Sequence, residues 1–172
     1  MMHKKLLALI ITSALALIAP VAHGEIITLN VPETNWHIRF DAPQLVEKYE
    51  VKRPNKYIFS AKAGGFNMSV LVEAPRDQGM RHEDCYNYYW PKTERSPMIA
   101  KSTVSATHTP KYYRVEYDTI VQFHHDRMRQ HNVDYYFADD GKWVDVHISI
   151  MAPTPADEAI LKTFDESLSY GK

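Results

Sequence analysis

The chain has 172 residues, of which 45% are hydrophobic and 24% charged, and it contains 10 Pro, 6 Gly and a single Cys. This composition is typical of a folded globular protein. It excludes a collagen-like rod, a disordered tail, a multi-span membrane protein and a disulfide-stapled miniprotein. The formal net charge of -1 gives no chain-wide basic field, so we expect no nucleic-acid partner.

The N-terminus, residues 1–24, has the layout of a secretory signal peptide. Lys4 and Lys5 precede an apolar run from Leu6 to Ala19, and Ala22 and Gly24 are small residues at the positions that a cleavage site needs. The run of about 14 residues is shorter than the roughly 20 that a spanning helix requires. We therefore expect a periplasmic or secreted protein without a membrane span after cleavage; an uncleaved N-terminal anchor is the alternative.

Short strands dominate the mature chain, residues 25–172, which we interpret as a single domain because it contains no linker or repeat. Apolar residues alternate with polar ones, as in strands that bury one face. A Gly64-Gly65 pair predicts a hairpin between two of these strands. The predicted strands are 27–31, 36–41, 56–62, 66–73, 112–123, 131–138 and 142–151.

The strongest hairpin signal is Asp140-Gly141, which fits a two-residue turn. With these two residues in the loop, Phe137, Tyr135 and Val133 face Val144, Val146 and Ile148 on one side of the sheet, and Tyr136, Asp134 and Asn132 face Asp145, His147 and Ser149 on the other. A slip of one residue would mix the two sets, so turn chemistry and hydrophobic pattern agree on one register.

The long strand 112–123 also alternates. We expect Tyr113 and Tyr117 on the core face together with Tyr135. The same alternation places Tyr112 and Arg114 on the polar face, beside Tyr136. Aromatic rings interleaved with charges are typical of a contact surface, but the same rings can equally be covered by loops or by a helix.

Two helices are expected. At the C-terminus, Thr154 suits the N-cap, Pro155 the first helical position and Gly171 the stop, and the apolar stripe between them includes Phe164. A second helix is predicted at about 81–90, ending before Pro91.

These elements predict an α+β fold: an antiparallel sheet of roughly six to eight strands, the C-terminal helix on one face, and one further helix. The order resembles the PsbP-like fold. The segment Phe66–Glu73 and the run from Asp140 through Ser149 into the helix at Thr154-Pro155 carry this resemblance. Members of that family mostly bind other proteins or have no assigned role, so the resemblance implies a binding module and transfers no catalytic residue.

The predicted polar face carries the first candidate site. Asp145, His147 and Ser149 alternate on one strand, opposite Asp134, which invites a hydrolase interpretation. Residues two apart on a strand are separated by roughly 6.5–7 Å, whereas a nucleophile and its base must lie within about 2.6–3.2 Å. An Asp134–His147 ion pair is a milder interpretation, either as a pH-sensitive binding point or as an ordinary solvated pair. The candidate partner-binding residues are Tyr136, Asp134, Asp145, His147, Arg114 and Tyr112.

A second candidate site is a histidine-rich loop. His124, His125 and His131 lie in or next to the predicted connection between strands 112–123 and 131–138, and imidazole rings are ligands for zinc or copper. Their spacing matches no standard zinc signature, and Arg127 and Arg129 oppose a cation. A solvated polar loop is the alternative.

We therefore expect an exported, non-enzymatic binding module with a protein partner, for example an immunity or inhibitor protein, and no cofactor. The alternative is a small metal-binding protein or hydrolase that uses the histidine loop or the Asp145/His147 face. Cys85 is expected to be a buried, inert thiol, with a reactive or intermolecular thiol as the alternative.

Overall fold

The structure is a computed structural model that describes residues 24–76, 79–123 and 125–172. The predicted signal peptide therefore lies, except for Gly24, outside the described residues. The main sheet has seven antiparallel strands in the order β3-β4-β5-β9-β8-β7-β6. Their bounds in that order are Glu47–Arg53, Lys56–Ala63, Phe66–Glu73, Lys142–Met151, Asp126–Asp139, Tyr113–Phe123 and Ser105–His108.

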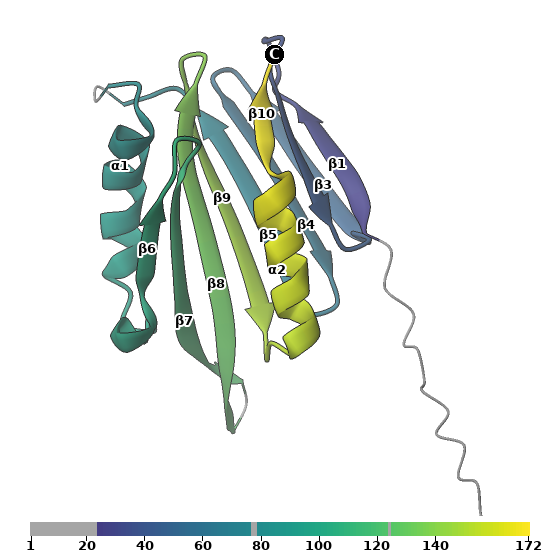
Figure 1. Cartoon of the computed structure of the whole chain (residues 1–172), viewed down its shortest axis with the longest axis vertical. Helices are drawn as coiled ribbons and strands as arrows, with labels where there is room; N and C mark the ends of the chain where they lie inside the picture. Colours follow the sequence, from purple (N-terminus) through teal and green to yellow (C-terminus); the bar gives the residue numbers. More distant parts are fainter. Residues whose placement is uncertain (1–23, 77–78, 124) are drawn as a thin grey trace, which may run out of the picture.

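A second sheet has three strands in the order β1-β2-β10. Its strands are β1 (Glu25–Asn30), β2 (His37–Ala42) and β10 (Ser169–Gly171), and two helices, α1 (His82–Glu94) and α2 (Pro155–Ser167), complete the α+β fold together with a short 3₁₀ turn, Lys101–Thr103. The predicted fold class is confirmed. In Figure 1, α1 lies beside β6 and β7, whereas α2, β1 and β10 lie toward the β3–β5 end of the sheet.

The Asp140-Gly141 hairpin has the predicted register. Asp139 pairs with Lys142, Tyr135 with Val146 and Asp134 with His147. Both turn residues have positive φ, 46° for Asp140 and 73° for Gly141, as a two-residue hairpin turn of this kind requires. The Gly64-Gly65 hairpin is confirmed as well, because Ala63 pairs with Phe66 across it.

One face of the main sheet is closed by α2 and the small sheet together. Val146 and Ile148 are fully buried there, as the register predicts. The ring of Phe164 on α2 lies 5.0 Å from that of Phe40 on β2 and 5.2 Å from that of Tyr135 on β8. We call this the α2 face.

The opposite face, the α1 face, is covered in part by α1, which packs on β7, β8 and β9. Cys85 and Trp90 are its buried residues. Tyr89 stacks on Tyr136 with ring centres 6.1 Å apart, and Trp90 packs on Tyr117 at 5.3 Å. This packing depends on aromatic rings more than on aliphatic side chains.

Both helices differ at their ends from the prediction. Helix α1 continues through Pro91 to Glu94, because a proline in the last turns removes only one backbone hydrogen bond there. Helix α2 begins as predicted, with Thr154 as N-cap and Pro155 in the first turn, but it ends at Ser167. Gly171 belongs to β10 and is not the helix stop. Within the described residues, no helix combines the length and the apolar character needed to cross a membrane.

Candidate functional site

The four polar residues predicted on the outer face of the β8–β9 hairpin lie together, but they are not on an open surface. Tyr136 is fully buried beneath α1 and Asp134 is 2% exposed. Asp145 and His147 are half-buried. The prediction that Tyr136 lies on a solvent-facing contact surface is wrong, because the aromatic side of α1 covers it.

Asp134 is the centre of a hydrogen-bonded group. Its Oδ1 lies 2.6 Å from Nδ1 of His147, and its Oδ2 accepts a hydrogen bond from the Tyr136 hydroxyl at 3.1 Å. The His147 side chain is 36% exposed, so the ring connects this buried group to solvent.

Asp145 has a different environment. Its Oδ1 is buried without a hydrogen-bond partner. Burial, together with the negative charges of Asp134 and Glu73, raises the pKa of Asp145 to about 7, against the opposing effect of His147. The Asp145 carboxyl group therefore gains or loses its proton as the pH passes through neutrality.

The pKa of His147 is also shifted. Burial lowers it, but the hydrogen bond to Asp134 and the charges of Asp134 and Asp145 outweigh burial, and the net effect is a raised pKa. The Asp134–His147 pair predicted from the sequence is thus present. The imidazolium form is favoured, as expected for a ring held by a carboxylate.

Tyr112 and Arg114 do not join this group, and their predicted placement is wrong. In the ladder, Arg114 pairs with Tyr135 and Tyr113 with Tyr136, so even-numbered residues of β7 point to the α2 face. Tyr112 is buried in the core under α2. Tyr113 and Tyr117, expected on the same face as Tyr135, lie on the α1 face instead. Alternation along β7 separates the two sets of residues, but both sets are covered, and alternation alone does not show which core each set enters.

Arg114 instead belongs to an ionic network on the α2 face. It contacts Glu116 at 2.6 Å and Asp165 of α2 at 3.1 Å. Between α2 and strands β7 and β8 this network borders a groove of about 310 Å³. The groove is lined by charged groups of both signs, and the Arg114–Asp165 pair within it joins β7 to α2.

The two described histidines of the predicted metal site, His125 and His131, do not lie in one loop. His131 lies within β8, because β7 and β8 extend to Phe123 and Asp126, and its ring nitrogens contact Asp118 at 2.8 Å and Glu116 at 3.1 Å. His125 is an exposed turn residue, and His124 lies outside the described residues. Among the described residues, no three His, Cys, Asp or Glu side chains are placed to hold a metal ion.

The described residues also do not form the contacts between serine and histidine that a hydrolase would need. Ser149 is buried and pairs with Asn132 rather than with His147. Ser69 lies opposite His147 across the β5–β9 ladder, yet no hydrogen bond joins them in the described part of the chain. Their backbone N–H groups are part of a continuous ladder, which provides no oxyanion hole.

The part of the α1 face beyond α1 is an accessible surface of the sheet, and sequence reasoning missed it. We define it as the bare half-face: the outward residues of β3, β4 and β5 on this side of the sheet. Tyr49 is 64% exposed, and the apolar side chains of Val51, Ile58 and Leu71 are half-buried. An open hollow of about 540 Å³ lies over it, next to Tyr49 and Ser60. Strand β3 was not predicted, because its charged residues hide a weak alternation of Tyr49 and Val51.

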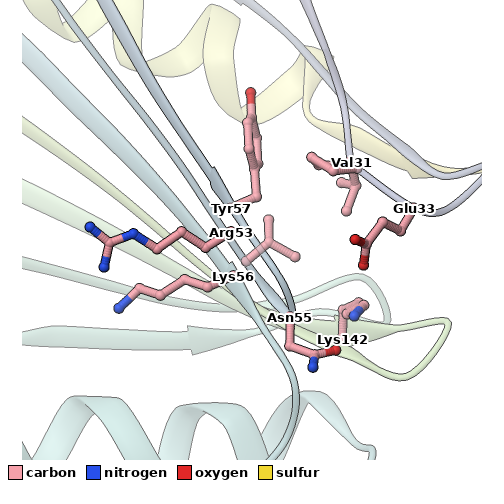
Figure 2. Close-up of a pocket in the computed structure, with 9 residues that line it drawn as sticks. Val31, Glu33, Arg53, Asn55, Lys56, Tyr57 and Lys142 are labelled. Atoms are coloured by element: carbon pink, nitrogen blue, oxygen red, sulfur yellow. The ribbon is translucent and has the colours of Figure 1, made fainter.

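The bare half-face ends in two cationic side chains. Arg53 and Lys56 pair with each other in the β3–β4 ladder, and in Figure 2 their side chains extend side by side, away from Tyr57. Neither has an acidic partner among the described residues. The small cavity whose lining residues are drawn in Figure 2, Glu33 and Lys142 among them, has a volume of about 10 Å³, which is the space of one water molecule rather than of a ligand.

Comparisons with known proteins identify no family. No family model and no curated protein matches the sequence. Among solved structures, LpqN, described as involved in cell envelope biogenesis of Mycobacterium tuberculosis, superposes with a TM-score of 0.49 at 9% identity, covering 87% of this chain and 92% of that one. A Bacteroides thetaiotaomicron protein gives a TM-score of 0.44 at 8% identity, covering 78% of this chain, which spans 45% of that protein's length. The PsbP-like resemblance stays a prediction.

Proposed function

We propose that this protein is an exported protein-binding module and that the bare half-face is its contact surface. One observation carries the proposal: α1 packs on β7, β8 and β9, and no element among the described residues covers the apolar side chains of β3, β4 and β5 on this face. Tyr49, at 64% exposure, stands in the middle of β3. Tyrosines in such positions contribute much contact area at a small cost in side-chain entropy.

The charges of this surface favour an acidic partner. Lys62 is neutralised by Glu47 at 2.8 Å, but Arg53 and Lys56 have no such partner in the described ranges. Glu73 lies opposite Lys56 in the β4–β5 ladder, but its carboxyl group contacts Tyr89 and Arg76. This end of the bare half-face therefore has an excess of positive charge. Complementary charge steers encounter and disfavours wrong partners, so a protein with a carboxylate-rich patch beside an apolar one fits best.

The side chains of the face, rather than the open edge of β3, are the proposed contacts. An edge strand presents unpaired backbone groups that attract other strands, and natural sheets protect such edges with charged residues, especially lysine. Along β3, Lys48 and Lys52 serve this purpose, paired with Glu25 and Glu50 at 2.8 Å each. This protection makes strand addition at β3 unfavourable.

Export is supported by the sequence of the first 24 residues, whose charged start, apolar run and small residues fit a signal peptide. Export would place the bare half-face in the periplasm or outside the cell. The absence of any intrachain disulfide from a one-cysteine chain leaves the core to stabilise the protein there.

Site-specific photo-crosslinking in the producing cell tests the contact surface. A crosslinking side chain is placed at Tyr49 of the full chain and, in a control, at Met98, which is 54% exposed away from the bare half-face. The proposal predicts one dominant adduct from position 49, with an acidic protein, and none from position 98. Equal crosslinking at both positions would contradict it.

Charge reversal tests the chemistry of the partner. Arg53→Glu with Lys56→Glu is expected to abolish the adduct at position 49. Arg39→Glu with Lys111→Glu changes the net charge equally at exposed positions elsewhere and should leave the adduct intact. An adduct that survives the first pair of substitutions would overturn the acidic-partner assignment.

One specific form of this function is inhibition of an enzyme, as in an immunity protein. It predicts that the crosslinked partner is an enzyme and that the purified module lowers its activity at equal concentration. The Arg53→Glu/Lys56→Glu variant should not lower it. A partner whose activity is the same with and without the module would limit the function to binding.

A further inference from the structure

The junction between α1 and the sheet contains more negative than positive charge. The titratable groups that face Asp145 come from every neighbouring element: Asp134 and Tyr136 from β8, His147 from β9, Glu73 from β5, Tyr117 from β7, and Cys85 and Tyr89 from α1. Three of these elements contribute a carboxyl group, and His147 is the one cation within the cluster. Arg76 reaches Glu73 only from the exposed rim, at 3.6 Å.

Hydrogen bonds satisfy two of the three carboxyl groups. Asp134 is bonded to His147 and Tyr136, and Glu73 accepts a hydrogen bond from the Tyr89 hydroxyl at 2.6 Å. Oδ1 of Asp145 is buried and has no partner. An ionised carboxylate in such a position, diagonal to Asp134 on the next strand, is costly unless it takes up a proton.

We propose that Asp134, Asp145 and His147 form a proton-dependent lock that holds α1 on the sheet, firm at mildly acidic pH and weakened above neutrality. With protons on Asp145 and His147, one carboxylate faces one imidazolium. Without them, two carboxylates face each other beneath the helix, and lifting α1 relieves their repulsion by admitting water. The lock is independent of the proposed function, because it concerns a different part of the α1 face.

The direction follows from the pKa values in the closed and open states. The pKa of Asp145 is raised from its ordinary 3.8 to about 7 by burial and by Asp134. Stabilisation of the closed form is therefore complete below about pH 4 and is lost as the pH rises through about 7. His147, whose pKa is also raised, loses its contribution as the pH rises above its ordinary 6.5, in the same direction.

Cys85 reports on the lock. It is the single cysteine of the chain, it lies on the sheet side of α1 with an exposure of 0%, and its thiol contacts the backbone oxygen of Val144 at 3.3 Å. A thiol reagent can reach it only when α1 lifts. The labelling rate of the folded chain, divided by the rate of the urea-unfolded chain at the same pH, gives the fraction open, because the division removes the pH dependence of the thiol itself.

The test measures this ratio at about pH 5.5 and about pH 8 for the wild type, Asp145→Asn and a control, Asp126→Asn. Asp126 is an exposed carboxyl group on the same sheet. The wild type and the control should open on the order of tenfold more at the higher pH. Asp145→Asn mimics the protonated group and leaves only the contribution of His147, so its ratio should rise clearly less than that of the wild type, and it should open less than the wild type at about pH 8.

Three results would overturn the lock: a wild-type ratio that does not rise with pH, a rise in Asp145→Asn as large as that of the wild type, or an Asp145→Asn chain less stable than the wild type at the higher pH. Hydrogen exchange supplies the second measurement. At about pH 8 the amides of α1 should exchange through a smaller opening free energy than those of β2. One common opening for both would show that α1 is not a separate unit.

Discussion

The two faces of the seven-stranded sheet are closed by different chemistry. On the α2 face, the apolar residues of β8 and β9 meet α2 and the small sheet in an apolar core, and the ionic network around Arg114 lies beside it. On the α1 face, tyrosines, tryptophans and carboxyl groups meet α1 over half the sheet, and the other half is bare. The alternating apolar residues correctly predict the core of the α2 face. The alternating polar residues do not mark a solvent-exposed surface, because α1 covers several of them.

The difference between the two faces is the reason why we place the contact surface on the α1 face. The α2 face is covered by packed side chains, so its residues stabilise the fold. The α1 face combines a closed half, whose stability depends on protonation, with an open half that can bind a partner.

Phe164→Ala should be the most damaging change, because it removes a fully buried ring of the α2 face that contacts Phe40 and Tyr135. We expect a loss of about 4 kcal/mol in the free energy of unfolding, measured by urea denaturation. A loss below about 1 kcal/mol would mean that the apolar face is not the main source of stability.

Arg114→Ala should cost about 2 kcal/mol, because it leaves Glu116 and Asp165 without their shared cation in a partly buried network. Arg129→Ala is the matched control: this arginine also has a carboxylate partner, Asp118, but its side chain is 56% exposed. Its loss should stay below about 1 kcal/mol. Equal losses in the two variants would show that burial does not separate the two ion pairs.

Tyr136→Phe tests how much one buried hydrogen bond stabilises the half of the α1 face that α1 covers. The change removes only the hydroxyl that donates to Asp134, with the ring left in place under α1. Urea denaturation should show a loss of about 1.5 kcal/mol, because a buried carboxylate loses a donor. Tyr49→Phe, at an exposed position, should show no loss; a similar loss there would indicate a general effect of removing hydroxyl groups.

Tyr49→Ala should have the smallest effect on folding. Its side chain lies on the bare half-face, so the free energy of unfolding should change by less than about 0.5 kcal/mol. The proposed function predicts that partner binding is nevertheless lost. A variant that is destabilised by more than about 1 kcal/mol would place Tyr49 in a packing role instead.

Much of the fold was predictable because local chemistry and global packing agree. The Asp140-Gly141 turn and the apolar residues flanking it gave a register that the structure confirms pair by pair. The start of α2 at Thr154 followed from capping rules. Strand β3 was not predictable, because an exposed edge strand carries charges that weaken its alternation.

The candidate site was predicted in part. The pairing of Asp134 with His147 followed from the register, but the burial of Tyr136 did not, because an amphipathic pattern with aromatic rings on both faces does not reveal which side a helix covers. Helix α1 itself has no clear apolar stripe. Its position depends on ring stacking and on polar contacts between residues far apart in the sequence.

Carbene footprinting of the full chain tests the central division of the α1 face most directly. We expect strong modification of the β3 segment at Tyr49, intermediate modification of Leu71 on β5, and little at Tyr136 and Trp143 beneath α1. Equal modification of the two halves would contradict it, as would protection of Tyr49 in the isolated protein.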